Sequence, residues 1–384
     1  MSSNPSPGCK IAAMSARFSA SLSASIIVIA ATLAPVSGQT PAKATKTATT
    51  KTWTAPLTPY GHPDLQGVWQ SNSATPLERP KALEGKAFLS DDEVAELKRR
   101  AARLFGAGNA DAAGGDNVFL AALANVDQFK SPNATGAQSV ERDFDNRTSL
   151  IVDPSDGRLP PLTPEGQKRV AAVDATSFTI PFQPGSDAAT QEKQAAAAAA
   201  RRRLPEGPED ISNDRRCITW GVPRLGGNYG AGLFSFYQIV QAPEYVVLTT
   251  EFIHDARIIP LDGRRHLSPS IRQWNGDSRG RWEGNTLVID TANFSSKSYF
   301  MGSAEHLHLV ERLTRVSPDL INYEITLDDP TTWTKPWTAV VRLKQTRNEI
   351  FEVACHEGNH FTMEGILAGA RAEEKAAAAK PESK

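Results

Sequence analysis

The side chains best suited to acid–base chemistry gather between residues 251 and 294. His254 stands beside Asp255 and close to Arg257, and Asp277 and Arg279 follow in the same stretch. A histidine near a carboxylate can act as a general base, with its tautomer set by that partner. An arginine can hold a carboxylate or stabilise developing negative charge. We therefore predict these five as catalytic residues; the competing interpretation is an ion-pair network that closes strand ends.

The carboxylate partner of His254 stays open at this stage. Neighbouring residues on a strand point to opposite faces, so Asp255 need not contact the histidine before it. Asp277 and Glu305 are the alternatives, and His306 is a second candidate for the base. Glu305 and His306 therefore join the predicted catalytic residues.

His306 and His308 also form an H-x-H motif. On a strand both imidazoles would point to one face, about 6.5 Å apart along it, which suits a divalent metal ion. Glu311 is a nearby carboxylate, but it lies an odd number of residues from both histidines and would point to the opposite face of the strand. We expect no cofactor, with a divalent metal at His306 and His308 as the alternative; the plainer interpretation is two solvated histidines.

A further histidine motif, from His356 to His360, matches the H-E-x-x-H of zinc metalloproteases. That mechanism needs both histidines on one helix. Here the motif follows a strand-like run and contains Gly358-Asn359, which is typical of a turn. The sequence therefore favours a polar turn over a zinc site.

Tryptophans and one more arginine are the predicted substrate-binding residues. Trp274, Trp282 and Trp333 can line an apolar pocket, and Arg264 can hold a polar end of a ligand. The alternative is that these tryptophans belong to the core and its rim. No G-x-S-x-G motif, phosphate loop or dinucleotide fingerprint is present, which argues against those enzyme classes.

Short β-branched runs alternate with turn signals across residues 211–361, which predicts antiparallel strands. A Gly-x-Trp sequence at Gly67 and Trp69 opens an earlier strand, and 148–152 is a short one. The later strands are expected at 236–240, 245–251, 256–261, 286–291, 305–316, 320–327, 337–344 and 350–355. We expect a mainly β protein with peripheral helices, built on an antiparallel β-barrel.

Helices and loops are expected between residues 75 and 205. Ser90 and Glu93 form a capping box before a helix that ends at Gly106, and Pro164 starts another helix. A single β-rich domain is expected over residues 53–365, with its main sheet at 211–361. A short helix and disordered tail should follow at 366–384.

The first residues predict export. A positive segment, an apolar run at residues 23–35 and small residues at 36–38 are typical of a signal peptide, here residues 1–38. Residues 39–52 read as a flexible linker. Cys217 and Cys355 lie beyond the signal, and in an oxidising compartment such a pair predicts a disulfide. The alternative is two buried thiols. We expect a periplasmic or secreted protein.

Nine motifs resemble a family of secreted proteins from soil and aquatic bacteria. They are GHPDLQGVW, PLERP, NRTSLIVDPSDGRLPPLTPEG, RRCITWGVPR, YQIVQAPEYVV, HDARIIPLDGR, GDSRGRWEGNTLVIDTANF, LHLVERLTRV and DDPTTWTKPWT. The resemblance covers residues 53–372 and implies export and one contiguous unit, without catalytic residues to carry over. Gly67-Val68-Trp69 and the late strands are, more loosely, similar to lipocalin-like barrels.

Composition narrows the classes of function. A net charge of −1 gives no electrostatic footprint for nucleic acid, and the apolar run is too short for a permanent membrane span. The predicted partner is a small molecule; the oligomeric state stays open. We carry two main hypotheses, an exported lyase, isomerase or hydrolase using histidine–carboxylate chemistry in a barrel mouth, and a non-catalytic small-molecule-binding protein. A metal-dependent barrel enzyme is the third.

Overall fold

The computed structural model describes most of the chain after residue 52. The described residues are 53–71, 73–105, 115–125, 143–174, 204–225, 236–251, 253, 255–347, 349–350 and 354–379. The predicted signal peptide, the linker and His254 lie outside them. The expected strand at 350–355 falls largely outside them as well.

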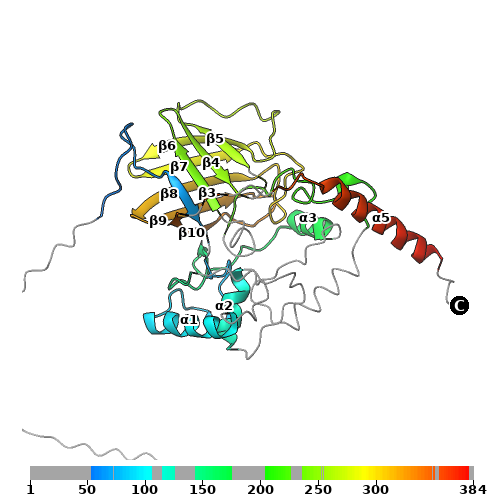
Figure 1. The fold of residues 1–384 in the computed structure, drawn as a ribbon, viewed down its shortest axis with the longest axis horizontal. Helices are drawn as coiled ribbons and strands as arrows, with labels where there is room; N and C mark the ends of the chain where they lie inside the picture. The colour runs from blue at the N-terminus through cyan, green and yellow to red at the C-terminus, as the bar shows by residue number, and fades with distance from the viewer. Residues whose placement is uncertain are drawn as a thin grey trace, which may run out of the picture. The chain divides into compact units, whose positions relative to one another are not determined.

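One antiparallel sheet dominates the described residues, which confirms the mainly β prediction (Figure 1). Its strands follow the order β5-β4-β3-β1-β10-β9-β8-β7-β6, and β2 pairs with β10. Their bounds are β1 Gly67–Gln70, β2 Ile151–Asp153, β3 Phe236–Gln241, β4 Tyr245–Thr250, β5 Ala256–Pro260, β6 Asp277–Glu283, β7 Thr286–Ala292, β8 His308–Ser317, β9 Leu320–Asp328 and β10 Trp337–Thr346. β1 therefore joins the β3–β5 part of the sheet to the β6–β10 part.

The predicted barrel is not confirmed. No backbone ladder joins β5 to β6 in the described part of the chain, so the sheet stays open. The two edges meet through side chains: a Cβ on Gly280 would lie 2.6 Å from Leu261 Cδ2 and 2.8 Å from Ile259 Cγ2. Pro260, which has no N–H to donate, also fits an unpaired edge.

The inner face of the sheet forms the main core because alternate residues on each strand point the same way. On β9 the alternation buries Ile321, Tyr323, Ile325 and Leu327. Trp69 is fully buried beneath the guanidinium of Arg315, 5.3 Å from its ring centre. The Gly-x-Trp strand thus supplies a large aromatic side chain to this core.

Two strands differ from the sequence prediction. β6 was not predicted, because its sequence, DSRGRWE, is mostly polar. β8 begins at His308, whereas we expected a strand from Glu305. Leu307 N donates to Ala304 O in a turn that precedes the strand.

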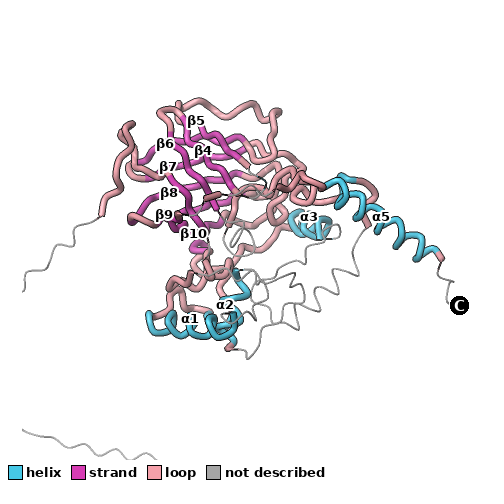
Figure 2. Tube along the Cα trace, viewed as in Figure 1, coloured by secondary structure: helices cyan, strands magenta, loops and turns pink. Residues whose placement is uncertain are grey.

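Helices lie beside the sheet (Figure 2). They are α1 Asp91–Phe105, α2 Gly115–Ala124, α3 Pro164–Asp174 and α5 Asn359–Ala378, with short 3-10 turns at Lys81–Leu83 and Pro208–Asp210. The capping box of α1 is confirmed: Ser90 N donates to Glu93 Oε2 at 2.8 Å, and Glu93 N to Ser90 Oγ at 3.3 Å. No described helix is long and apolar enough to cross a membrane.

The C-terminal helix is longer than expected. It starts at Asn359, directly after Gly358 with its positive φ of 70°, and runs for 20 residues. The turn signal of Gly358-Asn359 therefore marks the start of the helix. Just before it, Cys355 forms a disulfide with Cys217, with an S–S distance of 2.01 Å, which confirms that prediction.

Candidate functional site

A buried polar network lies on the inner face of the sheet around Arg257 of β5. Arg257 Nη1 donates to Glu311 Oε1 at 2.9 Å, and Nη2 donates to Glu311 Oε2. Nη2 also reaches Ser278 Oγ on β6 and Thr291 Oγ1 on β7, each at 3.0 Å. Tyr323 OH donates to Glu311 as well. One arginine thus connects β5 to β6, β7 and β8, across the edge where no ladder forms.

Strand periodicity places Glu311 in this network. It lies between Leu309 and Leu313 on the inward face of β8, and none of its surface is exposed. Burial opposes the charge of Arg257, but the adjacent Glu311 carboxylate outweighs burial and raises the pKa of Arg257. Burial raises the pKa of Tyr323 well above its ordinary value. Arg257 is therefore a cation and Tyr323 a neutral hydrogen-bond donor at neutral pH.

A second buried arginine lies close to the first. Arg224 Nη2 donates to Asp255 Oδ2 at 3.3 Å, and Thr219 Oγ1 donates to the same oxygen at 2.8 Å. Tyr237 OH donates to the carbonyl of Arg224 at 2.9 Å. Burial lowers the pKa of Arg224, while Tyr237 and Asp255 oppose that shift.

These two groups border a cavity of about 20 Å³ on the inner face of the sheet. Its surface is mostly apolar although both arginines belong to its wall. The lining residues are Gly221, Val222, Arg224, Tyr237, Ile239, Leu248, Thr250, Asp255, Arg257, Leu313, Tyr323 and Leu343. Asp255 and Arg257 are thus the predicted catalytic residues that the structure brings to one concave site.

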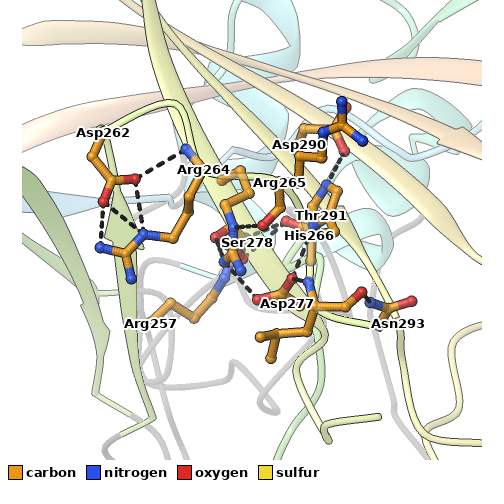
Figure 3. A network of polar contacts seen from close by, with 12 residues as sticks. Arg257, Asp262, Arg264, Arg265, His266, Asp277, Ser278, Asp290, Thr291 and Asn293 are labelled. Atoms are coloured by element: carbon orange, nitrogen blue, oxygen red, sulfur yellow. Dashed lines mark hydrogen bonds and ion pairs between the residues drawn. The ribbon is translucent and has the colours of Figure 1, made fainter. Parts of the chain in front are cut away.

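A second polar cluster surrounds His266 in the loop between β5 and β6, and Figure 3 draws it together with Arg257, Ser278 and Thr291. His266 Nδ1 lies 3.0 Å from Asp277 Oδ2, and Nε2 lies 2.9 Å from Asp290 Oδ1. His308 Nε2 lies 3.1 Å from both carboxylate oxygens of Asp290. Arg279 donates to Asp277 Oδ1 at 2.5 Å. Because Thr291 points inward to Arg257, its neighbour Asp290 points to the opposite face.

The pair of Asp290 and His308 should stabilise the fold most strongly in mildly acidic solution. The hydrogen bond with Asp290 raises the pKa of His308 above its ordinary 6.5. Partial burial opposes this rise, and the charge of Asp328 adds to it. The hydrogen bond with His308 lowers the pKa of Asp290 below its ordinary 3.8. Partial burial opposes this decrease, and the hydrogen bond with His266 adds to it. A raised histidine pKa stabilises the fold below pH 6.5, and this is lost as pH rises through the folded value. A lowered aspartate pKa stabilises it above pH 3.8 and is lost as pH falls.

Asp290→Asn is therefore expected to lower the pKa of His308, as measured by NMR titration of its imidazole protons. Urea unfolding should show a larger loss of stability relative to wild type at about pH 5.5 than at about pH 8.5. Asp319→Asn, in the turn after β8, is the matched control and should leave His308 unchanged. An unaltered His308 titration in Asp290→Asn would contradict the assignment.

Other predicted residues lie apart from both clusters. Glu305 is partly exposed and His306 is exposed; their side chains lie 3.8 Å apart, and Glu305 lies 3.7 Å from Arg272. Arg264 is half-exposed and pairs with Asp262. His254, the favoured base, lies outside the described residues.

The predicted binding tryptophans are spread over the protein. Trp333 is 2 % exposed and contacts Trp337 edge to face, with ring centres 5.6 Å apart. Trp282 stacks on His62 at 5.0 Å. Trp274 is half-buried, and its carbonyl accepts from Ser298 Oγ. Trp333 therefore belongs to the core. None of the three tryptophans is among the described residues that line the cavity beside Arg224 and Arg257.

The same-face geometry expected for the H-x-H motif is wrong. His306 lies in the turn before β8, and only His308 belongs to the strand, so the two do not share a strand face. His356 and Glu357 precede α5, while His360 lies within it. Among the residues that the structure describes, no three His, Cys, Asp or Glu side chains are grouped to hold a metal ion.

Sequence reasoning missed the residues that complete both clusters. They are Arg224, Tyr237, His266, Asp290, Glu311 and Tyr323. The alternation of side chains along a strand could have identified two of them. Glu311 and Tyr323 each lie at an inward-facing position of a strand whose neighbouring inward-facing residues are apolar. His266 had no such signal because it lies in a loop.

Comparison with models of protein families and with curated proteins finds no match to this chain.

Proposed function

We propose that this is an exported protein that binds a small molecule in the cavity beside Arg224 and Arg257. The observation that carries the proposal is the cavity itself, which is concave, mostly apolar and bordered by a few oriented polar groups. Ligand sites in proteins have this composition. The cavity is walled by strands from both parts of the sheet, β3–β5 and β8–β10, so its lining is held by a rigid scaffold.

The polar groups of the wall support binding without turnover. Each arginine contacts a carboxylate, and the two tyrosine hydroxyls donate to protein oxygens. A catalytic acid or base needs to reach the substrate, whereas these groups are held by one another. An exported location is part of the proposal; the disulfide supports it, because such bonds persist in oxidising compartments.

We also propose that the sheet works as a lipocalin-like barrel despite its open edge. The side chains of Arg257, Ser278 and Glu311 bridge that edge from the inside. Gly280 allows the β5 and β6 edges to approach closely. In this proposal, side chains join the two edges without a continuous ladder of backbone hydrogen bonds.

An enzyme is the second candidate, favoured by the geometry of His266. Asp277 holds its Nδ1, as a carboxylate does for a general base, and Arg279 holds Asp277. Its Nε2 contacts Asp290 Oδ1, so this candidate requires that a substrate displace Asp290 from the ring. The side chain of His266 is 30 % exposed, so solvent reaches this cluster. Proton transfer there is expected to be lost in His266→Asn, measured as turnover of a panel of small esters, lactones and hydroxy acids. Retained turnover in His266→Asn would remove this candidate.

Filling the cavity should abolish binding. Native mass spectrometry of the exported wild-type protein is expected to show a bound small molecule, and Leu343→Phe should lose it because the larger ring occupies the cavity. The cost in stability should be about 1–3 kcal/mol, typical of overpacking. Ile258→Phe, on the exposed side of β5, is the matched control and should keep the molecule. Equal occupancy in both variants would contradict the proposed site.

A further inference from the structure

Arg224, which is buried, and Arg257, which is mostly covered, suggest at first that the cavity receives an anion. A guanidinium binds a carboxylate through two parallel N–H groups, and two such groups border this cavity. The contacts of each arginine decide whether that capacity is still free.

Arg257 already has a carboxylate partner. Its Nη1 and Nη2 donate to the two oxygens of Glu311, and Nη2 also donates to Ser278 and Thr291. The side chain of Glu311 is fully buried. An incoming carboxylate would have to displace Glu311 or stay beside it, where the one guanidinium of Arg257 would face two negative charges.

Arg224 is balanced in a similar way. Its side chain is 4 % exposed and forms an ion pair with Asp255, which also accepts from Thr219. Among the described residues, the two ion pairs at the cavity balance: two arginines meet one aspartate and one glutamate. An anion would lose its hydration on entering and would meet two arginines that already have carboxylate partners, which is unfavourable.

The remaining wall is apolar. Much of it is formed by four aliphatic side chains, those of Ile239, Leu248, Leu313 and Leu343. The hydroxyls of Tyr237 and Tyr323 donate their hydrogen bonds to other protein oxygens. A cavity of about 20 Å³ has room for one or two water-sized groups. It therefore fits a short alkyl end, and the rest of a larger ligand lies beyond it.

We propose that the cavity takes the uncharged, apolar end of a small organic molecule and discriminates against carboxylates, although two arginines line it. This rests on the proposed binding function and assigns the chemical class of its ligand. The arginines act as fixed parts of the wall, and selectivity comes from the charge balance of the wall.

Two probes of equal chain length separate the alternatives: 1-butanol and butyrate, added to methyl-labelled protein at matched ionic strength. The NMR signals of the Leu248 and Leu343 methyl groups are expected to shift saturably with 1-butanol. Butyrate should bind at least roughly tenfold more weakly, which corresponds to about 1.4 kcal/mol. Equal or tighter binding of butyrate would overturn the assigned ligand class and leave the binding function in place.

If neither probe shifts the methyl signals and native mass spectrometry shows no bound molecule, the proposed binding function itself is wrong. Leu343→Phe should abolish the response to 1-butanol. Leu248→Ala, which enlarges the cavity, should bind 1-hexanol more tightly than wild type does. This second variant keeps the test informative if Leu343→Phe does not fold, and no gain for 1-hexanol would count against the apolar cavity.

Discussion

Replacing Glu311 with leucine is expected to lower the free energy of unfolding by about 3–5 kcal/mol. The substitution removes the carboxylate that pairs with Arg257, whose side chain is 11 % exposed, and that accepts from the buried Tyr323. It leaves an uncompensated cation on β5, the strand at the open edge of the sheet. Equilibrium unfolding in urea, followed by tryptophan fluorescence, measures the change.

Two further variants test the cause of that loss. Glu324→Leu makes the same substitution on β9, at a position next to the inward-facing Tyr323 and Ile325, and should cost less than about 1 kcal/mol. The double variant Arg257→Met with Glu311→Leu removes both charges and should be more stable than Glu311→Leu alone. If the double variant is the least stable of the three, the unpaired charge of Arg257 is not the cause of the lost stability.

Removing the disulfide is expected to cost about 2–5 kcal/mol. Cys217 precedes β3 and Cys355 follows β10, and the bond closes a loop with a sequence separation of 138 residues. Such a crosslink restricts the unfolded chain and so lowers its conformational entropy. The double variant Cys217→Ser with Cys355→Ser should show a lower midpoint of thermal unfolding than wild type.

A reductant provides the internal control for this prediction. Dithiothreitol should lower the midpoint of wild type toward that of the double variant and leave the double variant unchanged. If wild type and the double variant melt together in oxidising buffer, the disulfide does not stabilise the folded chain.

The sequence predicted the sheet well because alternation and turn residues are local signals. Strands β3, β4, β7, β9 and β10 lie where the β-branched runs are, and Ser90 with Glu93 marks the start of α1. β6 was missed because its side chains are polar, yet it pairs along its length with β7. Pairing with a neighbouring strand decided its structure, and local composition did not show this.

The candidate site was predicted only in part. Asp255 and Arg257 were identified from their chemistry, and they line the cavity. Their partners Arg224 and Glu311 are separated from them in sequence by tens of residues. Register across several strands brings these groups together, and a single sequence carries no direct signal of register.

The position of β1 has a consequence for how the chain is made. β1 pairs with β3 on one side and with β10 on the other, so Val68 lies opposite Thr346. A ribosome must synthesise nearly the whole chain before the two parts of the sheet can join. Contacts this distant in sequence slow folding. The emerging chain therefore cannot complete its sheet until most of it has been synthesised, and the β3–β5 part must wait for β10 with its β1 edge unpaired.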